Sequence, residues 1–188
     1  DAFCQVGAFP EAERQLRAAL ASAERMGLVN VAAMCKANLG YALAQVGRTT
    51  EAVGLERQAC DLMHAQRDQR REGFTRLYLS MIHWLAGSLT DASKEAEDAI
   101  PVVEPTPPLL AYACAMLARV RLAQERPTEA MVLADRAHAL LEELGGMDEG
   151  ESLVRLVRAQ ALRALDREEE AKRAIESARD ELLQRAAA

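Results

Sequence analysis

The residue types that most often perform chemistry are few in this chain and are scattered along it. His64, His83 and His138 are isolated, and no His-Glu-x-x-His, Gly-x-Ser-x-Gly or phosphate-binding glycine pattern occurs. His64 and His83 could approach each other across neighbouring helices, but two histidines without a placed acid are usually structural. We therefore expect no catalytic site, no metal site and no cofactor.

The cysteines point in the same direction. Cys4, Cys35, Cys60 and Cys114 never approach the two-residue spacing of a redox or zinc motif. Free cysteine is among the most buried residue types, so we interpret all four as reduced thiols that pack in the core.

Charge and hydropathy exclude two classes of partner. The net charge is -6 and the pI is near 5.2, with acids and bases interspersed, so we expect no nucleic acid partner. Charges interrupt every stretch of the length that a membrane helix needs, so we expect no membrane partner either. The chain starts at Asp1 without the basic, then apolar, then small-residue order of an export signal, and we expect a cytoplasmic protein.

A repeat with a period of about 40 residues runs through the chain. When the repeats are aligned, the residues at the turn position are Gly7, Gly47, Gly87, Glu125 and Asp166. Four residues later comes an acid, and the next residue is always alanine: Ala12, Ala52, Ala92, Ala130 and Ala171. Two helical turns further on, alanine recurs at Ala19, Ala59, Ala99, Ala137 and Ala178.

Each feature of the repeat has a physical role in a helical hairpin. Alanine lets two helices approach closely at their crossing, and a second alanine seven residues later extends that seam. Glycine accepts the left-handed conformation that ends a helix, and an acid in the first turn of the next helix meets the positive end of its dipole. The unit is therefore helix, turn, helix.

The repeat resembles the tetratricopeptide family. Leu39-Gly40, then Gly47, Glu51-Ala52 and Ala59 follow that family's order and spacing. Later units hold small residues at the early glycine, and the fifth unit departs furthest, with Arg158-Ala159 in place of Leu-Gly. The resemblance implies an all-α fold: a right-handed superhelix of antiparallel helix-turn-helix repeats, an alpha-alpha solenoid.

We expect a single repeat domain over residues 1–188 with five units, of which the first is partial. The units are about 1–28, 29–68, 69–107, 108–147 and 148–188. The expected helices are 10–27, 29–46, 50–67, 70–86, 90–103, 108–124, 127–144, 149–165 and 168–186. The prolines from Pro101 to Pro108 mark one irregular joint, which is either a connector or a bend. Because the first unit lacks most of its partner helix, we expect apolar surface around Leu16 and Leu20, and self-association or fraying there.

The resemblance also implies that the first helix of each unit lines the inward, concave side. In the second unit its inward positions hold Met34, Asn38, Tyr41 and Gln45, and in the third Phe74, Tyr78, Met81 and Trp84. In the fourth they hold Tyr112, Met116, Arg119 and Leu122, and the fifth adds Leu153, Val157 and Gln160. Most of the aromatic residues fall in this set, so its members from Asn38 to Arg119 are our candidate peptide-binding residues.

Two interpretations of these bulky residues stay open. They either fill the space between long helices or form a ligand groove, and for Trp84 we favour the groove because an indole N–H needs a partner. A clamp for chaperone tails is disfavoured, because only Asn38 matches its basic and Asn-rich pattern.

The expected function is a protein or peptide interaction module of a larger bacterial signalling or transcriptional regulator, as the repeat length resembles the long-repeat subgroup of the family. The alternative is a structural spacer or self-association module whose concave face holds no ligand. An enzyme would require residues that the chain lacks.

Overall fold

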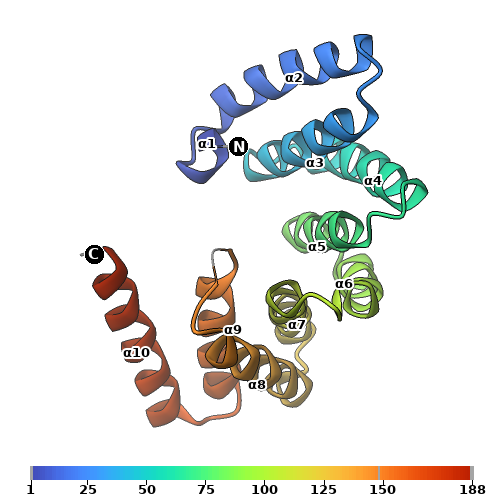
Figure 1. The fold of residues 1–188 in the computed structure, drawn as a ribbon. Coiled ribbons are helices and arrows are strands. Elements are labelled where there is room, and N and C mark those ends of the chain that lie inside the picture. The colour runs from blue at the N-terminus through green and yellow to red at the C-terminus, as the bar shows by residue number, and fades with distance from the viewer. Residues whose placement is uncertain (1, 148, 187–188) are drawn as a thin grey trace. The chain divides into compact units, whose positions relative to one another are not determined.

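A computed structural model describes residues 2–147 and 149–186, and every regular element in this part of the chain is an α-helix (Figure 1). The first five helices are α1 (Ala2–Gln5), α2 (Phe9–Arg25), α3 (Val29–Gln45), α4 (Thr49–Ala65) and α5 (Gln69–Leu85). They are followed by α6 (Leu89–Val103), α7 (Pro107–Ala123), α8 (Pro127–Leu144), α9 (Glu151–Ala164) and α10 (Glu168–Ala186). No helix in the described residues is long and apolar enough to span a bilayer.

The expected helix bounds agree with the observed ones to within about two residues. The expected helix 70–86, for example, is Gln69–Leu85. The start of α9 comes later than expected because of Gly150, whose φ of 86° lies outside the helical region and delays the first turn.

The chain divides into two compact units, Asp1–Val102 and Val103–Ala188. The boundary falls in the proline-rich segment expected to be irregular, where Pro101 lies inside α6 and Pro107 opens α7. Whether the two units form the single repeat domain that the sequence suggests stays a prediction.

Consecutive helices pack against each other within each unit. In the first unit α2 contacts α3, α3 contacts α4, and α4 contacts α5, while the Ser80 hydroxyl of α5 donates to the Ala92 carbonyl of α6 at 2.7 Å. In the second unit α7, α8, α9 and α10 follow the same order. In addition α3 touches α5, and α7 touches α9, so the first helices of neighbouring repeats lie side by side.

The repeated alanines form the seams between these helices. Ala12, Ala52, Ala92 and Ala130 are completely buried, and Ala171 is 6% exposed. The second alanine of the repeat is also fully buried at Ala59, Ala99 and Ala137. Ala19 is exposed instead, because the only long helix that packs on α2 in the described residues is α3.

The turn position of the repeat is left-handed whether or not it holds glycine. The φ angle is 82° at Gly47, 59° at Glu125 and 59° at Asp166. After each of these turns the amide of the next residue bonds the carbonyl five residues before it, as in Arg48 to Leu43 and Arg126 to Arg121, both at 2.9 Å. These are the helix-ending bonds of a Schellman motif, so the backbone and not the side chain defines the turn.

The expected exposure of Leu16 is wrong, because α3 covers this side of α2 and leaves Leu16 only 7% exposed. Leu20 is half-buried. Exposed apolar side chains gather instead around the turn from α2 to α3: Met26, Leu28, Val29, Val31 and Met34. Cys35, Cys60 and Cys114 are buried as expected, whereas Cys4 is half-buried.

The alanine seam predicts a difference between two substitutions at the same repeat position. Ala59→Leu places a large side chain in a closed seam and is expected to lower the free energy of unfolding by about 1 to 3 kcal/mol. Ala19→Leu, at an exposed position, should change it by less than about 0.5 kcal/mol. Urea denaturation of both variants measures the difference, and equal losses would mean that Ala59 is not at a close crossing.

The left-handed turn position predicts that two substitutions change the stability in opposite directions. Gly47→Ala forces a Cβ into a φ of 82° and should destabilise by about 1 kcal/mol, although the new atom meets nothing within 4 Å. Glu125→Gly removes the same strain and should stabilise by up to about 1 kcal/mol, less the entropy that glycine loses on folding. Thermal unfolding tests the pair, and a destabilising Glu125→Gly variant would show that the Glu125 side chain contributes contacts of its own.

Candidate functional site

The inward positions of α3 and α5 lie next to each other in the first unit and form a cluster of rings. The ring centroids of Tyr41 and Tyr78 are 5.0 Å apart, and those of Tyr78 and Phe74 are 4.5 Å apart. Phe9, at the start of α2, extends the series with an edge contact to Tyr41 at 6.4 Å. Three helices, α2, α3 and α5, thus contribute to one aromatic series, Phe9–Tyr41–Tyr78–Phe74.

Burial differs along this series. Tyr78 is only 7% exposed and lies between the rings of Tyr41 and Phe74, so it supports them and offers little surface itself. Phe9, Tyr41 and Phe74 are half-buried and present part of each ring to solvent. Packing therefore accounts for Tyr78, whereas both interpretations stay open for Tyr41 and Phe74.

The remaining candidate residues of the first unit lie on the same two helices, α3 and α5. We call the whole set the inward face of the first unit: Met34, Asn38, Tyr41, Gln45, Phe74, Tyr78, Met81 and Trp84. Met34 and Gln45 are exposed, Asn38 and Trp84 are half-buried, and Met81 is 7% exposed. The Gln45 amide joins the two helices, because its Nε2 lies 3.9 Å from the Met81 sulfur.

The inward positions of the second unit are mostly packing residues. Met116 is completely buried, as is Val157, and Leu153 is 8% exposed. Tyr112 is 8% exposed because the loop before α9 covers its ring, and a Cβ on Gly150 would lie only 2.6 Å from Tyr112 Cδ2.

Three inward positions of the second unit keep some exposure to solvent. Arg119 and Leu122 are half-buried, and Gln160 is exposed. Burial lowers the pKa of the Arg119 guanidinium, and the nearby Tyr112 opposes this shift.

Phe9 was missed by sequence reasoning, although it belongs to the aromatic series. It is the first residue of a second helix, a position that the resemblance does not assign to the concave side. The sequence signal that could have identified it is its place two residues after the turn at Gly7, next to the short α1.

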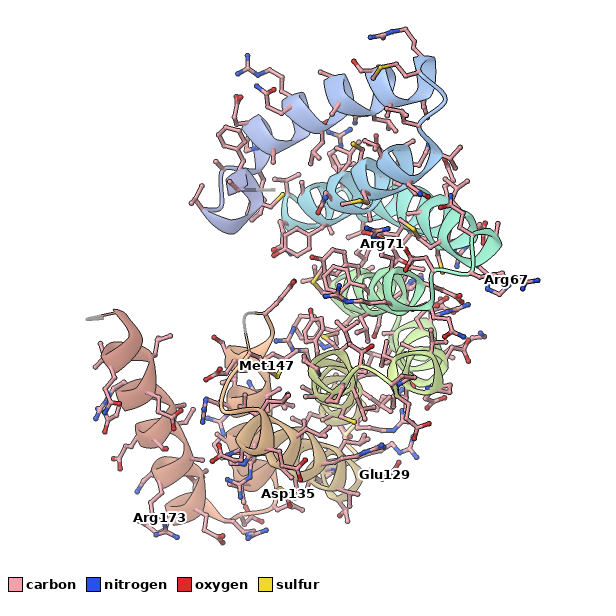
Figure 2. The ribbon with its side chains drawn as sticks, viewed as in Figure 1. Arg67, Arg71, Glu129, Asp135, Met147 and Arg173 are labelled. Atoms are coloured by element: carbon pink, nitrogen blue, oxygen red, sulfur yellow. The ribbon has the colours of Figure 1, made fainter. Side chains whose placement is uncertain are left out.

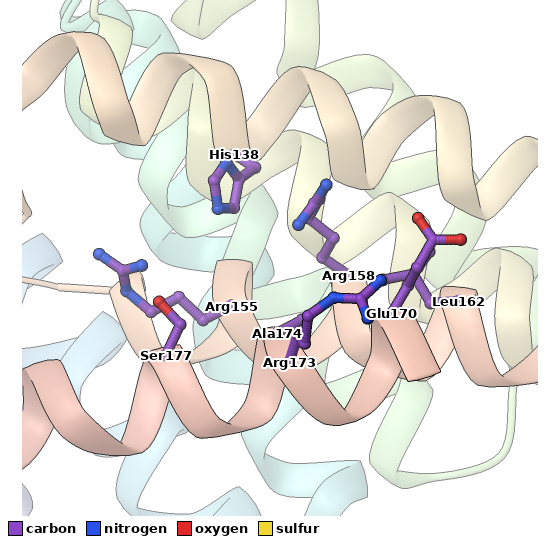
Figure 3. Close-up of a pocket in the computed structure, with 8 residues that line it drawn as sticks. All are labelled: His138, Arg155, Arg158, Leu162, Glu170, Arg173, Ala174 and Ser177. Carbon is purple, nitrogen blue, oxygen red and sulfur yellow. The ribbon is translucent and has the colours of Figure 1, made fainter. Parts of the chain in front are cut away.

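A cavity of about 330 Å³ lies between α8, α9 and α10 of the second unit (Figure 3). His138 reaches it from α8, Arg155 and Arg158 from α9, and Arg173 from α10. Sequence reasoning treated His138 as isolated, because these residues come together only through the packing of three helices. Burial lowers the pKa of His138, and the nearby Arg158 guanidinium lowers it further.

Ion pairs within the protein neutralise most of the positive charge in this cavity. Arg155 contacts Glu151 at 3.0 Å and also pairs with Glu181, while Arg158 contacts Asp135 at 3.0 Å. Arg173 has no ion pair in the described residues and extends into solvent (Figure 2). We interpret the cluster as a network that fastens three helices together, because most of its guanidinium groups already have carboxylate partners.

Glu56 of α4 is a buried acid that no periodicity analysis predicted. It is completely buried, and neither carboxyl oxygen has a hydrogen-bond partner in the described residues. It fits because Gly40 of α3 has no side chain, and a Cβ there would lie 2.8 Å from Glu56 Cγ. Burial alone raises the pKa of the Glu56 carboxyl well above its usual range.

The two histidines of the first unit have different surroundings. His64 is exposed, and its Nδ1 lies 3.0 Å from the Glu72 carboxylate, while His83 is 6% exposed. In the described residues no group of three or more histidine, cysteine, aspartate or glutamate side chains is placed to hold a metal ion.

Among the comparisons with known proteins, those with solved structures support the fold. The sequence matches no protein-family model and is similar to no curated protein. The crystal structure of a variant of a kinesin light chain-like protein of Podosopora anserina, with nearly identical TPR-like repeats, matches with a TM-score of 0.73 at 18% identity. That match covers 100% of this chain and 92% of the other.

A second structure of the Podosopora anserina protein matches with a TM-score of 0.71 at 19% identity, over 95% of this chain and 89% of the other. BtubC (BKLC) from P. vanneervenii matches with a TM-score of 0.74 at 16% identity, over 95% of this chain and 74% of the other. The chain therefore has the all-α, TPR-like alpha-alpha solenoid fold that the repeat predicted.

Glu56 makes stability depend on pH in a predictable direction. Its pKa is raised in the folded state, so below the ordinary carboxyl range both states are protonated and folding is not penalised. As the pH rises through that range, the unfolded chain ionises first and the free energy of unfolding falls. Glu56→Gln cannot ionise, so its stability relative to the native protein should increase from about pH 4 to about pH 7. Urea denaturation at both pH values measures this, and a difference that is independent of pH would contradict a raised pKa.

Proposed function

We propose that this protein is a non-catalytic interaction module that binds an extended peptide segment of another protein along the inward face of the first unit. The observation that carries the proposal is the aromatic series, in which a buried Tyr78 holds the half-exposed rings of Tyr41 and Phe74 in place. Rigid aromatic surface with polar groups beside it is what protein interfaces use as anchors.

The fold supports the proposal in a general way. Stacked helical hairpins place the first helices of neighbouring repeats side by side, as α3 and α5 are here, and so create an extended surface for a partner. The same scaffold serves many partners, so the residues on this face and not the fold must decide the ligand. The larger bacterial regulator in which we expected the module stays a prediction, which the full-length gene would test.

Selection from a random dodecapeptide library tests the proposal without knowledge of the partner. Peptides selected on the native protein should bind the Tyr41→Ala/Phe74→Ala variant about tenfold more weakly or worse, because two central anchors are removed. Val132→Ala, which truncates an exposed apolar side chain of α8, is the matched control and should bind with unchanged affinity. Fluorescence anisotropy of labelled peptides measures all three affinities, and circular dichroism verifies that each variant is folded.

The exposed apolar residues at the turn from α2 to α3 favour self-association as a second candidate. Peptide binding and self-association predict different results in these experiments. If selected peptides bind the native and double-variant proteins equally, the inward face is not the binding site and our proposal fails. If, in addition, light scattering shows a mass that rises with concentration and returns to the monomer value in Val31→Ser, self-association replaces it.

A further inference from the structure

The last helix of the second unit exposes apolar side chains at repeat positions that are buried in earlier repeats. In α2, α4, α8 and α10 the residues nine places after the turn position are Leu16, Glu56, Ala134 and Ile175. The residues sixteen places after it are Ala23, Met63, Leu141 and Leu182. In α2, α4 and α8 all of them are at most 7% exposed, whereas Ile175 is 44% and Leu182 62% exposed. Helix α10 therefore lacks a cover that the other three helices have.

Helix α2 shows what provides this cover. In the described residues the long helix that packs on α2 is α3, the first helix of the following repeat, and most of the partner helix of its own repeat is missing. Leu16 and Ala23 are nevertheless only 7% and 1% exposed. The surroundings of α10 are the reverse, because α9 of its own repeat packs on it and no later helix is present in the described residues (Figure 1). The first helix of a following repeat is thus what covers these two positions.

A groove lies between α9 and α10 at the uncovered positions. Its volume is about 310 Å³, and the residues that line it include Leu156, Ala159 and Arg163 of α9 and Ala171, Lys172 and Ile175 of α10. We call these residues, together with Leu182 and Glu176 further along α10, the α9–α10 groove. In the preceding repeat the corresponding helices are α7 and α8, and α9 packs on both. In the first unit α5 packs on α3 and α4 in the same way.

These two arrangements favour a helix as the occupant of the α9–α10 groove. A helix satisfies its own backbone hydrogen bonds, so it can lie on apolar side chains such as Ile175 and Leu182. An extended segment would need backbone partners, and the backbone groups of α9 and α10 are already bonded within their own helices. The helix that fills the place on α8 has a stripe of completely buried aliphatic residues, which are Val154, Val157 and Ala161.

Ion pairs accompany the first helices where they pack on a preceding second helix. Arg158 of α9 contacts Asp135 of α8 at 3.0 Å, and Lys36 of α3 contacts Glu24 of α2 at 3.0 Å. In both pairs the base belongs to the first helix and the acid to the second helix. Glu176 of α10 corresponds in the repeat to Asp135, and it is exposed and has no ion pair in the described residues.

The basic residues near Glu176 do not take its place as a partner for the occupant. Arg179 lies one turn further along α10, but its guanidinium bonds Asp180 at 2.8 Å. Lys172, one turn before Glu176, pairs with Glu169 at 3.1 Å. A base on the occupant therefore still has a carboxylate to meet at Glu176.

We propose that the α9–α10 groove binds an amphipathic α-helix of a partner protein, in the way that α9 packs on α7 and α8. The apolar stripe of that helix packs on Ile175 and Leu182, and a basic side chain beside the stripe pairs with Glu176. The inference goes beyond the proposed function, because the groove belongs to the second unit and shares no residue with the inward face of the first unit.

A helical probe for the groove comes from the chain's own α9. The probe is a fluorescein-labelled peptide of residues 150–165 with a hydrocarbon staple between positions 152 and 156, whose side chains are exposed in the protein. The staple keeps the peptide helical, since an isolated helix of this length is marginally stable in water. Fluorescence anisotropy should show saturable binding to the native protein.

Variants of the protein locate the contact. Ile175→Ser/Leu182→Ser should bind the probe about tenfold more weakly or worse, because two apolar contacts are lost. Both side chains are exposed in the free protein, so circular dichroism should show an unchanged fold. Val132→Ser, which replaces an exposed apolar side chain of α8, is the matched control and should bind with unchanged affinity.

A charge exchange tests how the bound helix lies. Arg158→Glu in the probe should weaken its binding to the native protein about threefold, because the new carboxylate faces Glu176. Glu176→Arg in the protein should restore the binding of the changed probe, as expected of two residues in contact. If Glu176→Arg has no such effect, the helix does not lie as α9 does on α8, and the inference is wrong.

The remaining outcomes separate a partner helix from a second copy of the chain. No binding of the stapled probe at up to about 1 mM protein, or equal binding to Ile175→Ser/Leu182→Ser, would overturn the inference. Light scattering should show a mass that this double variant does not change. A mass that rises with concentration and returns to the monomer value in the double variant would assign the groove to self-association instead. None of these results depends on Tyr41 or Phe74, so the proposed function is tested separately.

Discussion

The close crossing of helices at small side chains is the constraint on which the rest of the structure depends. Ala52 and Ala92 are completely buried where the second helices meet their neighbours, and a larger side chain there would separate the backbones. Because the seam sets the spacing, α3 and α5 come into contact and their aromatic rings reach across at 5.0 Å. Glu56 shows how the rule can be relaxed: a long side chain enters this layer only where Gly40, opposite to it, has no side chain.

The sequence predicted the helices and their order because these depend on local and periodic information. The turn position illustrates this well, since Glu125 and Asp166 adopt the same left-handed φ as the glycines with which the repeat aligned them. Helix ends follow from backbone hydrogen bonds that any residue can make, so the repeat register predicted them even where glycine is absent.

The exposure of each inward residue could not be predicted in the same way. Whether an inward side chain is accessible depends on what packs over it, and for Tyr112 the cover is the loop at Gly150, whose path no repeat pattern specifies. Phe9 joins the aromatic series from a helix that the resemblance places elsewhere. The burial of Glu56 could not be predicted for a different reason. A charged residue type is normally assigned to the surface, and only the missing side chain at Gly40 makes room for Glu56 in the core.

Charged side chains of neighbouring second helices pair with each other on their exposed sides. Ion pairs such as Arg17–Glu51 and Arg48–Glu13, both at 2.7 Å, join the exposed sides of the second helices α2 and α4. Pairs of this kind contribute about 0 to 1 kcal/mol each, so they neither define the fold nor explain a ligand.

Under the proposed function, packing and binding are not competing roles for the aromatic residues. A half-exposed ring on a single helix could rotate among several rotamers, and a ligand would lose affinity in proportion to the freedom it removes. Tyr41 is held by Phe9 on one side and Tyr78 on the other, and Phe74 is held by Tyr78. The burial of Tyr78 therefore fixes the accessible rings before any ligand arrives. A buried residue that contributes little surface of its own can in this way hold its half-buried neighbours in place for the proposed ligand.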